Sequence, residues 1–326
     1  MKKILVVGYG SVGKRHVTNL LSNTNSEIII CTKRKDLKLG KSVKICQTIE
    51  NALKEKPDIG FITNETSYHL PIARKLAENG LDLFIEKPLS DSFTHVRDLM
   101  ITVKKNHLIT QMGCNFRFHP CLQKIKEIID SGKLGRILSV QVESGSYLPD
   151  WHPYEDYSKG YAARKDLGGG IVLTCIHEID YLYWFFGNVK EAFSITGKLS
   201  DLHVTADDMA AIILKFKSNI IAEVHLDYFQ RPDFKKCKIK GIDGTIQWDS
   251  DSNEVKFYQK NRKKWVQLMK LNNFRRNQMF VDEIKHFIKC VNKHESTMND
   301  IVQGVETLKI CLAIKKASKM KKMVKV

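Results

Sequence analysis

Several features that often direct the interpretation of a sequence are missing from this chain of 326 residues. No run of apolar residues approaches the roughly 18 that a membrane-spanning helix requires. The apolar run at residues 4–7 is too short for a secretory signal peptide. No two of the eight cysteines have the C-x-x-C spacing typical of zinc sites and redox pairs. We therefore expect a soluble, cytoplasmic protein with no metal site and no membrane partner.

Acidic residues are too few to balance the basic ones. The chain has 53 Lys and Arg against 36 Asp and Glu, a formal net charge of +17. Such an excess is typical of nucleic-acid-binding proteins. However, the lysines are scattered, and their densest cluster, residues 315–325, lacks the interleaved aromatic residues of a base-stacking surface. We therefore expect no nucleic-acid partner but a solvated basic surface that attracts anionic substrates.

The most informative stretch lies at the start of the chain. Residues 4–7 are β-formers, and a helical pattern begins near residue 15. Between them stand Gly8, Tyr9, Gly10, Ser11, Val12 and Gly13, the G-x-G-x-x-G fingerprint of a dinucleotide-binding turn. The first glycine permits the sharp turn, the second lets backbone approach a pyrophosphate, and the third lets helix and strand pack closely. The N–H groups at the helix start then bind phosphate. The alternative is an ordinary strand–turn–helix in which the glycines occur by chance.

The second predicted strand, residues 27–31, bears on the choice of nicotinamide cofactor. The position just past it, roughly 20 residues after the glycines, contacts the adenosine ribose in dinucleotide-binding folds. An acidic residue there would bind the 2′-hydroxyl of NAD, but this chain has Thr32, Lys33, Arg34 and Lys35. Hydroxyl and guanidinium groups suit a 2′-phosphate. We therefore expect NADP(H); NAD(H) remains the alternative if this is an ordinary basic loop.

Strands and helices alternate regularly up to residue 118. Further strands are predicted at 59–62, 81–85 and 108–113, and helices at 49–56, 70–79 and 93–106. This alternation predicts a parallel, doubly wound sheet, in which ligands bind beyond the carboxyl ends of the strands. Polar residues just past those ends are therefore expected to contact the cofactor: Thr63, Asn64, Thr66, His69, Glu86, Lys87 and Asn115.

The pattern changes near residue 120. A predicted helix at 120–131 and a strand at 137–146 precede a long polar and aromatic loop, residues 148–165, of a length that often serves a function. The segments that follow are a helix at 171–186, an antiparallel series of strands from 189 to 271, and helices at 279–292 and 301–318. A chain of this length suggests two domains. We predict an α/β protein with a dinucleotide-binding domain at 1–118 and a substrate-binding and oligomerisation domain at 119–326.

Four motifs taken together are more specific than any one alone. They are the glycine turn, Glu86-Lys87-Pro88, the N-F-R-F of residues 115–118, and the G-G-G of residues 168–170 followed by His177-Glu178-Ile179-Asp180. With them the chain resembles, from end to end, the glucose–fructose oxidoreductase / inositol dehydrogenase / MocA (Gfo/Idh/MocA) family. The resemblance implies a Rossmann domain and an α+β domain whose open, mostly antiparallel sheet forms homodimers or homotetramers. It also implies an enzyme with NAD(P)-dependent redox chemistry on sugars, polyols or their nucleotide-linked forms.

Two residues match catalytic positions of this family. Lys87 matches the lysine of E-K-P, where a cation stabilises the alkoxide formed as a hydride leaves carbon. A cis bond before Pro88 would aim this lysine inward. His177 matches the histidine after the triple glycine, and an unperturbed pKa of about 6.5 suits it to proton transfer. The alternatives are a surface lysine before a turn proline and a histidine that only pairs with Asp180.

The chain departs from the family pattern at two places. Many members carry an aspartate three or four residues before the histidine, where this chain has Leu173 and Thr174. A threonine cannot act as a base near neutral pH, so a proton relay must either differ from the family's or be shortened to Lys87 and His177. The usual Pro-Asn pair after the third strand is Glu65-Thr66 here. This second departure concerns the contacts on the nicotinamide side, whereas the missing aspartate motivates an alternative function, a non-catalytic regulatory protein that senses NAD(P) or a sugar.

The loop at residues 147–164 bears on the substrate. Its sequence, including Tyr161 and Arg164, resembles a subgroup associated with bacterial surface-polysaccharide sugar pathways. We expect four residues to bind the substrate: Arg117, Tyr161, Arg164 and Asp180. The alternative for Tyr161 and Arg164 is that they only pack the loop.

Overall fold

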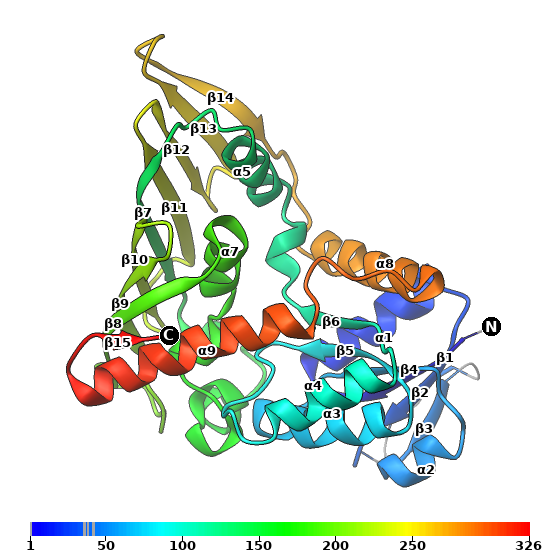
Figure 1. The fold of residues 1–326 in the computed structure, drawn as a ribbon. Helices are drawn as coiled ribbons and strands as arrows, with labels where there is room; N and C mark the ends of the chain where they lie inside the picture. The colour runs from blue at the N-terminus through cyan, green and yellow to red at the C-terminus, as the bar shows by residue number, and fades with distance from the viewer. Residues whose placement is uncertain (1, 35–36, 38, 41–42) are drawn as a thin grey trace. The chain divides into compact units, whose positions relative to one another are not determined.

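The chain forms two compact units in a computed structural model that describes residues 2–34, 37, 39–40 and 43–326 (Figure 1). The first unit contains the residues up to Asn115 together with Arg276–Val305, and the second contains Phe116–Arg275 and Glu306–Val326. This division differs from the expected single boundary at residue 118 because a late segment of the chain belongs to the first unit.

A six-stranded sheet in which every neighbouring pair is parallel organises the first unit. Its spatial order is β3 (Val43–Cys46), β2 (Glu27–Cys31), β1 (Lys3–Val7), β4 (Ile59–Ile62), β5 (Asp82–Glu86) and β6 (Thr110–Gly113). The order reverses direction between β1 and β4, which is where dinucleotides bind in such folds. The predicted doubly wound parallel sheet is therefore confirmed.

Helices cover both faces of this sheet. They are α1 (Ser11–Asn23), α2 (Ile49–Leu53), α3 (His69–Glu78), α4 (Val96–Lys105) and α8 (Asn277–Lys293). Figure 1 shows α3 and α4 on one face, with α1 and α8 on the other. The rings of Phe61 and Phe84 stack at 4.6 Å, and Phe287 of α8 packs edge-on against both. Burial of this aromatic side chain explains why α8 belongs to the first unit although it follows most of the second in sequence.

A nine-stranded sheet organises the second unit, and all its neighbouring pairs are antiparallel except β7–β10. The spatial order is β14 (Lys264–Lys270), β13 (Glu254–Gln259), β12 (Gly244–Asp249), β11 (Phe234–Gly241), β7 (Ile137–Gly145), β10 (Ile221–Asp227), β9 (Met209–Phe216), β8 (Val189–Gly197) and β15 (Val324–Lys325). Alternate residues of β9 are buried, as expected for a sheet with one covered face. The predicted open, mostly antiparallel sheet is confirmed.

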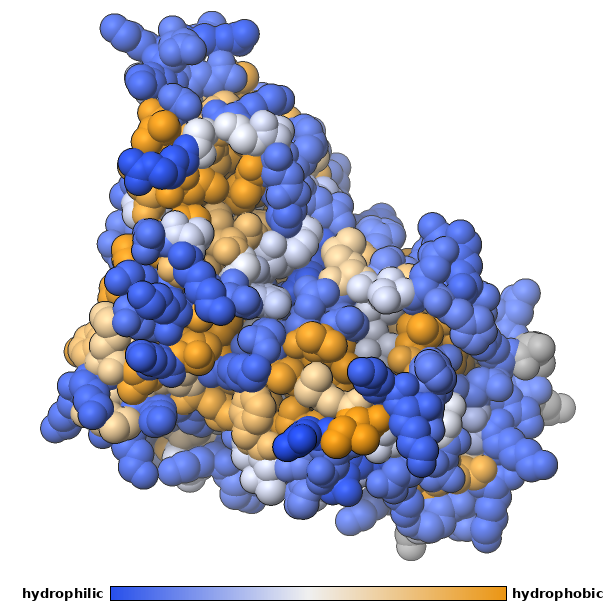
Figure 2. Space-filling view, in the orientation of Figure 1, coloured by the Kyte–Doolittle hydropathy of each residue, from blue (hydrophilic) through white to orange (hydrophobic). Residues whose placement is uncertain are grey.

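The remaining helices lie in or enter the second unit. They are α5 (Pro120–Asp130), α6 (Ile171–Thr174), α7 (His177–Phe186) and α9 (Ile301–Met320), and the division between the units falls within α9. The predicted loop at residues 148–165 contains short 3-10 turns, among them Leu148–Trp151, Tyr157–Lys159 and Tyr161–Ala163. The turn between β13 and β14, at the top of Figure 1, is covered by hydrophilic atoms in Figure 2, which matches its run of basic residues.

The single helix predicted at 171–186 is wrong, since the structure breaks it at Cys175. The reason is tertiary, because the two halves are anchored separately. Asp207 accepts a hydrogen bond from the backbone N–H of Ile171 at 2.8 Å, whereas α7 is tied by the buried side chains of Glu178 and Asp180. The break makes His177 the first residue of α7.

Candidate active site

The glycine turn between β1 and α1 has the geometry of a phosphate-binding turn. Gly8 has a φ of +97°, and a Cβ there would lie 2.8 Å from the backbone N of Asn64. A Cβ at Gly13 would collide with the carbonyl oxygen of Gly8, whereas one at Gly10 would meet nothing within 4 Å. The start of α1 has no side-chain cap and no acidic residue in its first turn. These features fit the pyrophosphate of a dinucleotide, since open space adjoins helix N–H groups.

Two of the predicted cofactor residues shape this turn rather than present a side chain. The hydroxyl of Thr63 donates to the carbonyl of Gly8 at 2.9 Å and lies within 3.1 Å of that of Val7. The ring of Tyr9 is buried in the hydrophobic core of the first unit. Backbone atoms are therefore what Tyr9 and Thr63 offer to a ligand.

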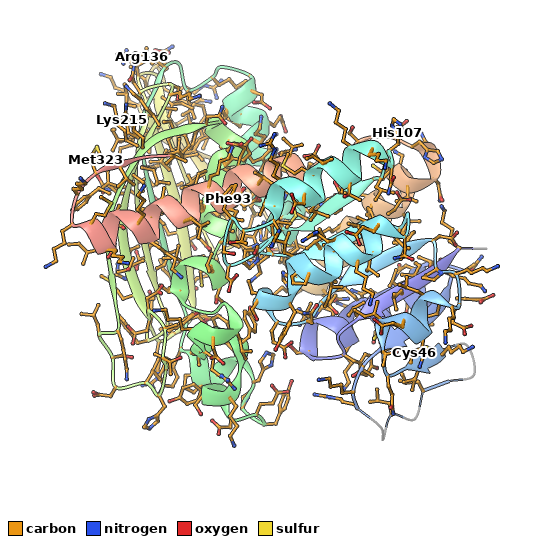
Figure 3. The ribbon with its side chains drawn as sticks, turned by 60° about the horizontal axis from the view of Figure 1, so that its bottom comes forward. Cys46, Phe93, His107, Arg136, Lys215 and Met323 are labelled. Carbon is orange, nitrogen blue, oxygen red and sulfur yellow. The ribbon has the colours of Figure 1, made fainter. Side chains whose placement is uncertain are left out.

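The loop after β2 presents the predicted ribose-binding residues. The N–H of Thr32 donates to the carbonyl of Cys46 at 3.0 Å, and the N–H of Arg34 donates to the Thr32 hydroxyl at 3.3 Å. Cys46, labelled in Figure 3, is the last residue of β3, so this contact ties the loop to the sheet. The side chains of Lys33 and Arg34 are exposed, and Lys35 lies outside the described residues.

His69, at the start of α3, is placed differently from the expected cofactor ligand. Its side chain is 1% exposed, and both ring nitrogens face backbone carbonyls: Nδ1 is 2.7 Å from Pro88 O and Nε2 is 2.9 Å from Asn64 O. Burial lowers the pKa of His69, although the hydrogen bonds with the two carbonyls and the charge of Glu86 act to raise it. The ring therefore connects the loop after β4 to the loop after β5.

The end of β5 and the residue that follows it combine a buried anion with the predicted catalytic lysine. Glu86 is 7% exposed, and its Oε1 accepts a hydrogen bond of 2.6 Å from Nε2 of His16. Burial alone would raise the pKa of Glu86, but the His16 hydrogen bond and the Lys87 ammonium hold it below its usual value. Lys87 is half-buried, and the predicted cis bond before Pro88 is present.

His16 was not among the predicted site residues, although the sequence contained a signal for it. It stands one turn into α1 on the same face as the buried Gly13, Val17 and Leu20. A histidine on that face requires a polar partner. Two further predicted residues, Thr66 and Asn115, are also buried within the first unit, after β4 and β6 respectively.

His177 is accompanied in the second unit by an ion pair that the sequence did not reveal. Its ring lies 5.0 Å from that of Phe116, and the next residue, Glu178, is buried. Nζ of Lys235 lies 2.6 Å from Oε1 of Glu178 and 2.5 Å from the hydroxyl of Ser144. Because Glu178 lies on α7 and Lys235 on β11, the pair fixes the start of α7 against the sheet.

Arg117 and Asp180, both expected to bind the substrate, are instead bound to each other. Nε and Nη2 of Arg117 donate to the two Asp180 oxygens at 2.9 and 2.8 Å, and the side chains are 0% and 1% exposed. The hydroxyl of Thr307 lies 3.5 Å from the same carboxylate. Both charges are compensated within the core, so we assign these two residues to the framework of the second unit.

The other two expected substrate residues lie nearer the surface. Tyr161 is half-buried in its 3-10 turn, and Arg164 makes a bidentate ion pair with the exposed Asp166. Their substrate contacts stay a prediction.

The structure therefore brings together, within the first unit, the residues that follow β1, β4 and β5. The contacts join Gly8, Thr63, Asn64, His69 and Pro88, the residue that follows Lys87. His177 belongs to the second unit. Across the described part of the chain, no group of three or more His, Cys, Asp or Glu side chains is arranged to hold a metal ion. No helix among those described has the length and apolar character to cross a membrane.

Comparison with known proteins covers both units. Residues 2–114 match the model of an oxidoreductase family with an NAD-binding Rossmann fold, and residues 122–247 match that of the GFO/IDH/MocA C-terminal domain. Myo-inositol 2-dehydrogenase of Thermotoga maritima is 25% identical over 99% of this chain and 98% of its own length. An uncharacterized oxidoreductase of Bacillus subtilis, YrbE, is 26% identical over 67% of this chain, which corresponds to 65% of YrbE. A solved structure of levoglucosan dehydrogenase with NADH has a similar fold, with a TM-score of 0.89 and 16% identity over 100% of this chain and 99% of that one.

Proposed function

Because the chain belongs to the Gfo/Idh/MocA family of oxidoreductases, we propose that it transfers a hydride between a nicotinamide cofactor and a C–OH or C=O group of a sugar, polyol or nucleotide-sugar. Membership makes it an enzyme that uses a nicotinamide cofactor. Relatives named as inositol and levoglucosan dehydrogenases support the substrate class. They also favour an enzyme over the alternative, a non-catalytic sensor.

The observation that carries the proposal is the connection of the glycine turn to the segment that holds Lys87. The turn leaves open space at Gly10 beside an uncapped helix start, and Thr63 and the Asn64 loop lie against it. The bound cofactor would supply the hydride acceptor or donor. Lys87 would stabilise negative charge on the reacting oxygen.

His177 is the proposed proton-transfer residue. A histidine titrates near neutral pH, so it can accept or return a proton in the same turnover. Thr174, which stands where many relatives have an aspartate, is buried at the end of α6 and provides no base. The proposed relay therefore consists of Lys87 and His177, with Tyr161 and Arg164 as substrate contacts.

Hydride transfer is tested by following the absorbance of the reduced nicotinamide of NADPH or NADH. The substrates are a panel of myo-inositol, scyllo-inositol, levoglucosan and UDP-glucose. We expect Lys87→Met to lower kcat by about 100-fold or more, the contribution of a positioned acid–base or charge-stabilising group. Lys104→Met, which alters an exposed lysine of α4, is the matched control and should keep full activity. Undiminished turnover in Lys87→Met would refute the proposed role.

We further propose that the cofactor is NADP(H), with NAD(H) as the alternative. Thr32, Lys33 and Arg34 offer a hydroxyl and two cations where an acidic residue would select NAD. Calorimetric titration of cofactor-free protein with NADPH and NADH tests this, and Arg34→Ala should weaken NADPH binding more than NADH binding. Tighter binding of NADH than of NADPH would show that the basic loop does not contact the 2′ position.

A further inference from the structure

A histidine contacts the residue on each side of Lys87. Nε2 of His16 lies 2.6 Å from the carboxylate of Glu86, and Nδ1 of His69 lies 2.7 Å from the carbonyl of Pro88. Each histidine belongs to the helix that follows a predicted cofactor loop: His16 to α1 and His69 to α3. Neither has a role in the hydride transfer proposed above.

The His16 contact lies in an apolar pocket. The imidazole is fully buried, with the rings of Phe61, Phe84 and Phe280 at 5.6, 5.0 and 6.0 Å. The Glu86 carboxylate is also pressed against β6, because a Cβ at Gly113 would come within 2.9 Å of it. A buried carboxylate needs its hydrogen-bond donor, so the pair fixes the end of β5 relative to α1.

The His69 contact connects two loops. While Nδ1 faces Pro88, Nε2 faces the carbonyl of Asn64 at 2.9 Å, and a Cβ at Gly8 would lie 2.8 Å from the N of the same Asn64. A neutral imidazole donates through one nitrogen, and an imidazolium donates through both. In either form the ring lies between the loop that adjoins the glycine turn and the backbone that follows Lys87.

We propose that His16 and His69 are positioning residues that hold the backbone on both sides of Lys87 in register with the glycine turn. This inference rests on the proposed function, which makes Lys87 the charge-stabilising group. The two contacts restrict the backbone beside Lys87 to a fixed position relative to the glycine turn and the Asn64 loop. They can do so because all the residues involved are buried or half-buried, and the interior of a protein packs closely.

The reactivity of the Lys87 amine provides a test that needs no substrate. Wild-type protein and variants are acylated with acetic anhydride, and mass spectrometry gives the rate at Lys87 relative to the exposed Lys104 of the same unit. His69→Leu and His16→Phe remove the donors, whereas His69→Asn and His16→Gln retain an amide donor near Nδ1 and Nε2 respectively. We expect Lys87 to react about fivefold faster in the first two variants, since the loss of one hydrogen bond loosens the segment by about that factor. The amide variants should stay within about twofold of the wild type.

A matched control separates positioning from general loosening. His286 on α8 accepts a hydrogen bond from the backbone N–H of Met298 at 2.9 Å, so His286→Leu should lower the melting temperature without changing the Lys87 rate. If His69→Leu does not fold, the comparison of His69→Asn with His69→Gln replaces it, because the glutamine amide reaches the Nε2 side instead of Pro88. A faster rate in His69→Gln than in His69→Asn then supports the proposal.

The inference would be overturned if Lys87 were acylated at the same rate in His69→Leu, His16→Phe and the wild type. It would also be overturned if the control His286→Leu raised that rate as much as His69→Leu and His16→Phe do. The failure of the proposed function has a different signature. In that case Lys87→Met keeps hydride transfer, while the acylation rates still report whether the two histidines hold the segment.

Discussion

The Arg117–Asp180 pair leads to a prediction that separates a structural role from substrate binding. Arg117→Met keeps the length of the side chain and removes the guanidinium, so the Asp180 carboxylate loses both short hydrogen bonds in a site that is 1% exposed. Removal of one partner of a buried ion pair costs about 3–5 kcal/mol. For a unit of this size that loss lowers the melting temperature by roughly 6–20 °C.

Tryptophan fluorescence is a suitable assay because the four tryptophans, residues 151, 184, 248 and 265, all lie in the second unit. The midpoints of thermal and urea unfolding should fall strongly in Arg117→Met. They should change little in Arg136→Met, which replaces an exposed arginine of the same unit that is labelled in Figure 3. The double variant Arg117→Met with Asp180→Asn should lose less stability than the sum of the single variants, since neither charge is then stranded. An unchanged melting temperature with a raised KM for the substrate would refute the structural role and restore the substrate-binding interpretation.

Three further predictions follow from the contacts. Gly10→Ala should keep the melting temperature and weaken NADH binding, measured by fluorescence, about tenfold. Gly13→Ala should instead unfold the first unit, because a Cβ at Gly13 collides with backbone and one at Gly10 does not. The hydrogen bond with Asp227 raises the pKa of His225 despite its partial burial, and the nearby charges of Asp227 and Glu143 act in the same direction. The protonated His225 therefore stabilises the folded state fully below the unfolded pKa, and this contribution disappears as pH rises through the folded pKa. The melting-temperature gap between wild type and His225→Gln should accordingly be larger at about pH 5.5 than at about pH 9, and an equal gap at both would contradict this assignment. Finally, we propose that copies of the chain associate through the exposed face of the nine-stranded sheet, where the exposed Ile195 of β8 pairs with Ala211 of β9. Ile195→Lys should then reduce the molecular mass measured by light scattering, and an unchanged mass would exclude this face.

Local physics made much of the first unit predictable. An unbroken apolar run such as residues 4–7 forms a strand buried on both faces, and glycines at fixed spacing permit a turn that other residues cannot adopt. The regular alternation of strands and helices then leaves few topologies, and the observed order of the parallel sheet is one of them. The sequence by itself therefore determined the type of both sheets and most of their strands, although not the edge strands β3 and β15, together with the place of the glycine turn and the neighbours of Lys87 along the chain.

Tertiary structure decided which polar groups meet. Arg117 and Asp180 are 63 positions apart, and His16 and Glu86 are 70 apart, so no local pattern relates them. Burial forces such groups to find partners, and the choice depends on how strands and helices are stacked. Tertiary packing also decided that α8, whose apolar face is buried in the core of the first unit, belongs to that unit. It likewise decided the helix break at Cys175, which makes His177 the first residue of α7. Spacing along a chain fixes backbone geometry, but only packing in three dimensions assigns partners to buried charges.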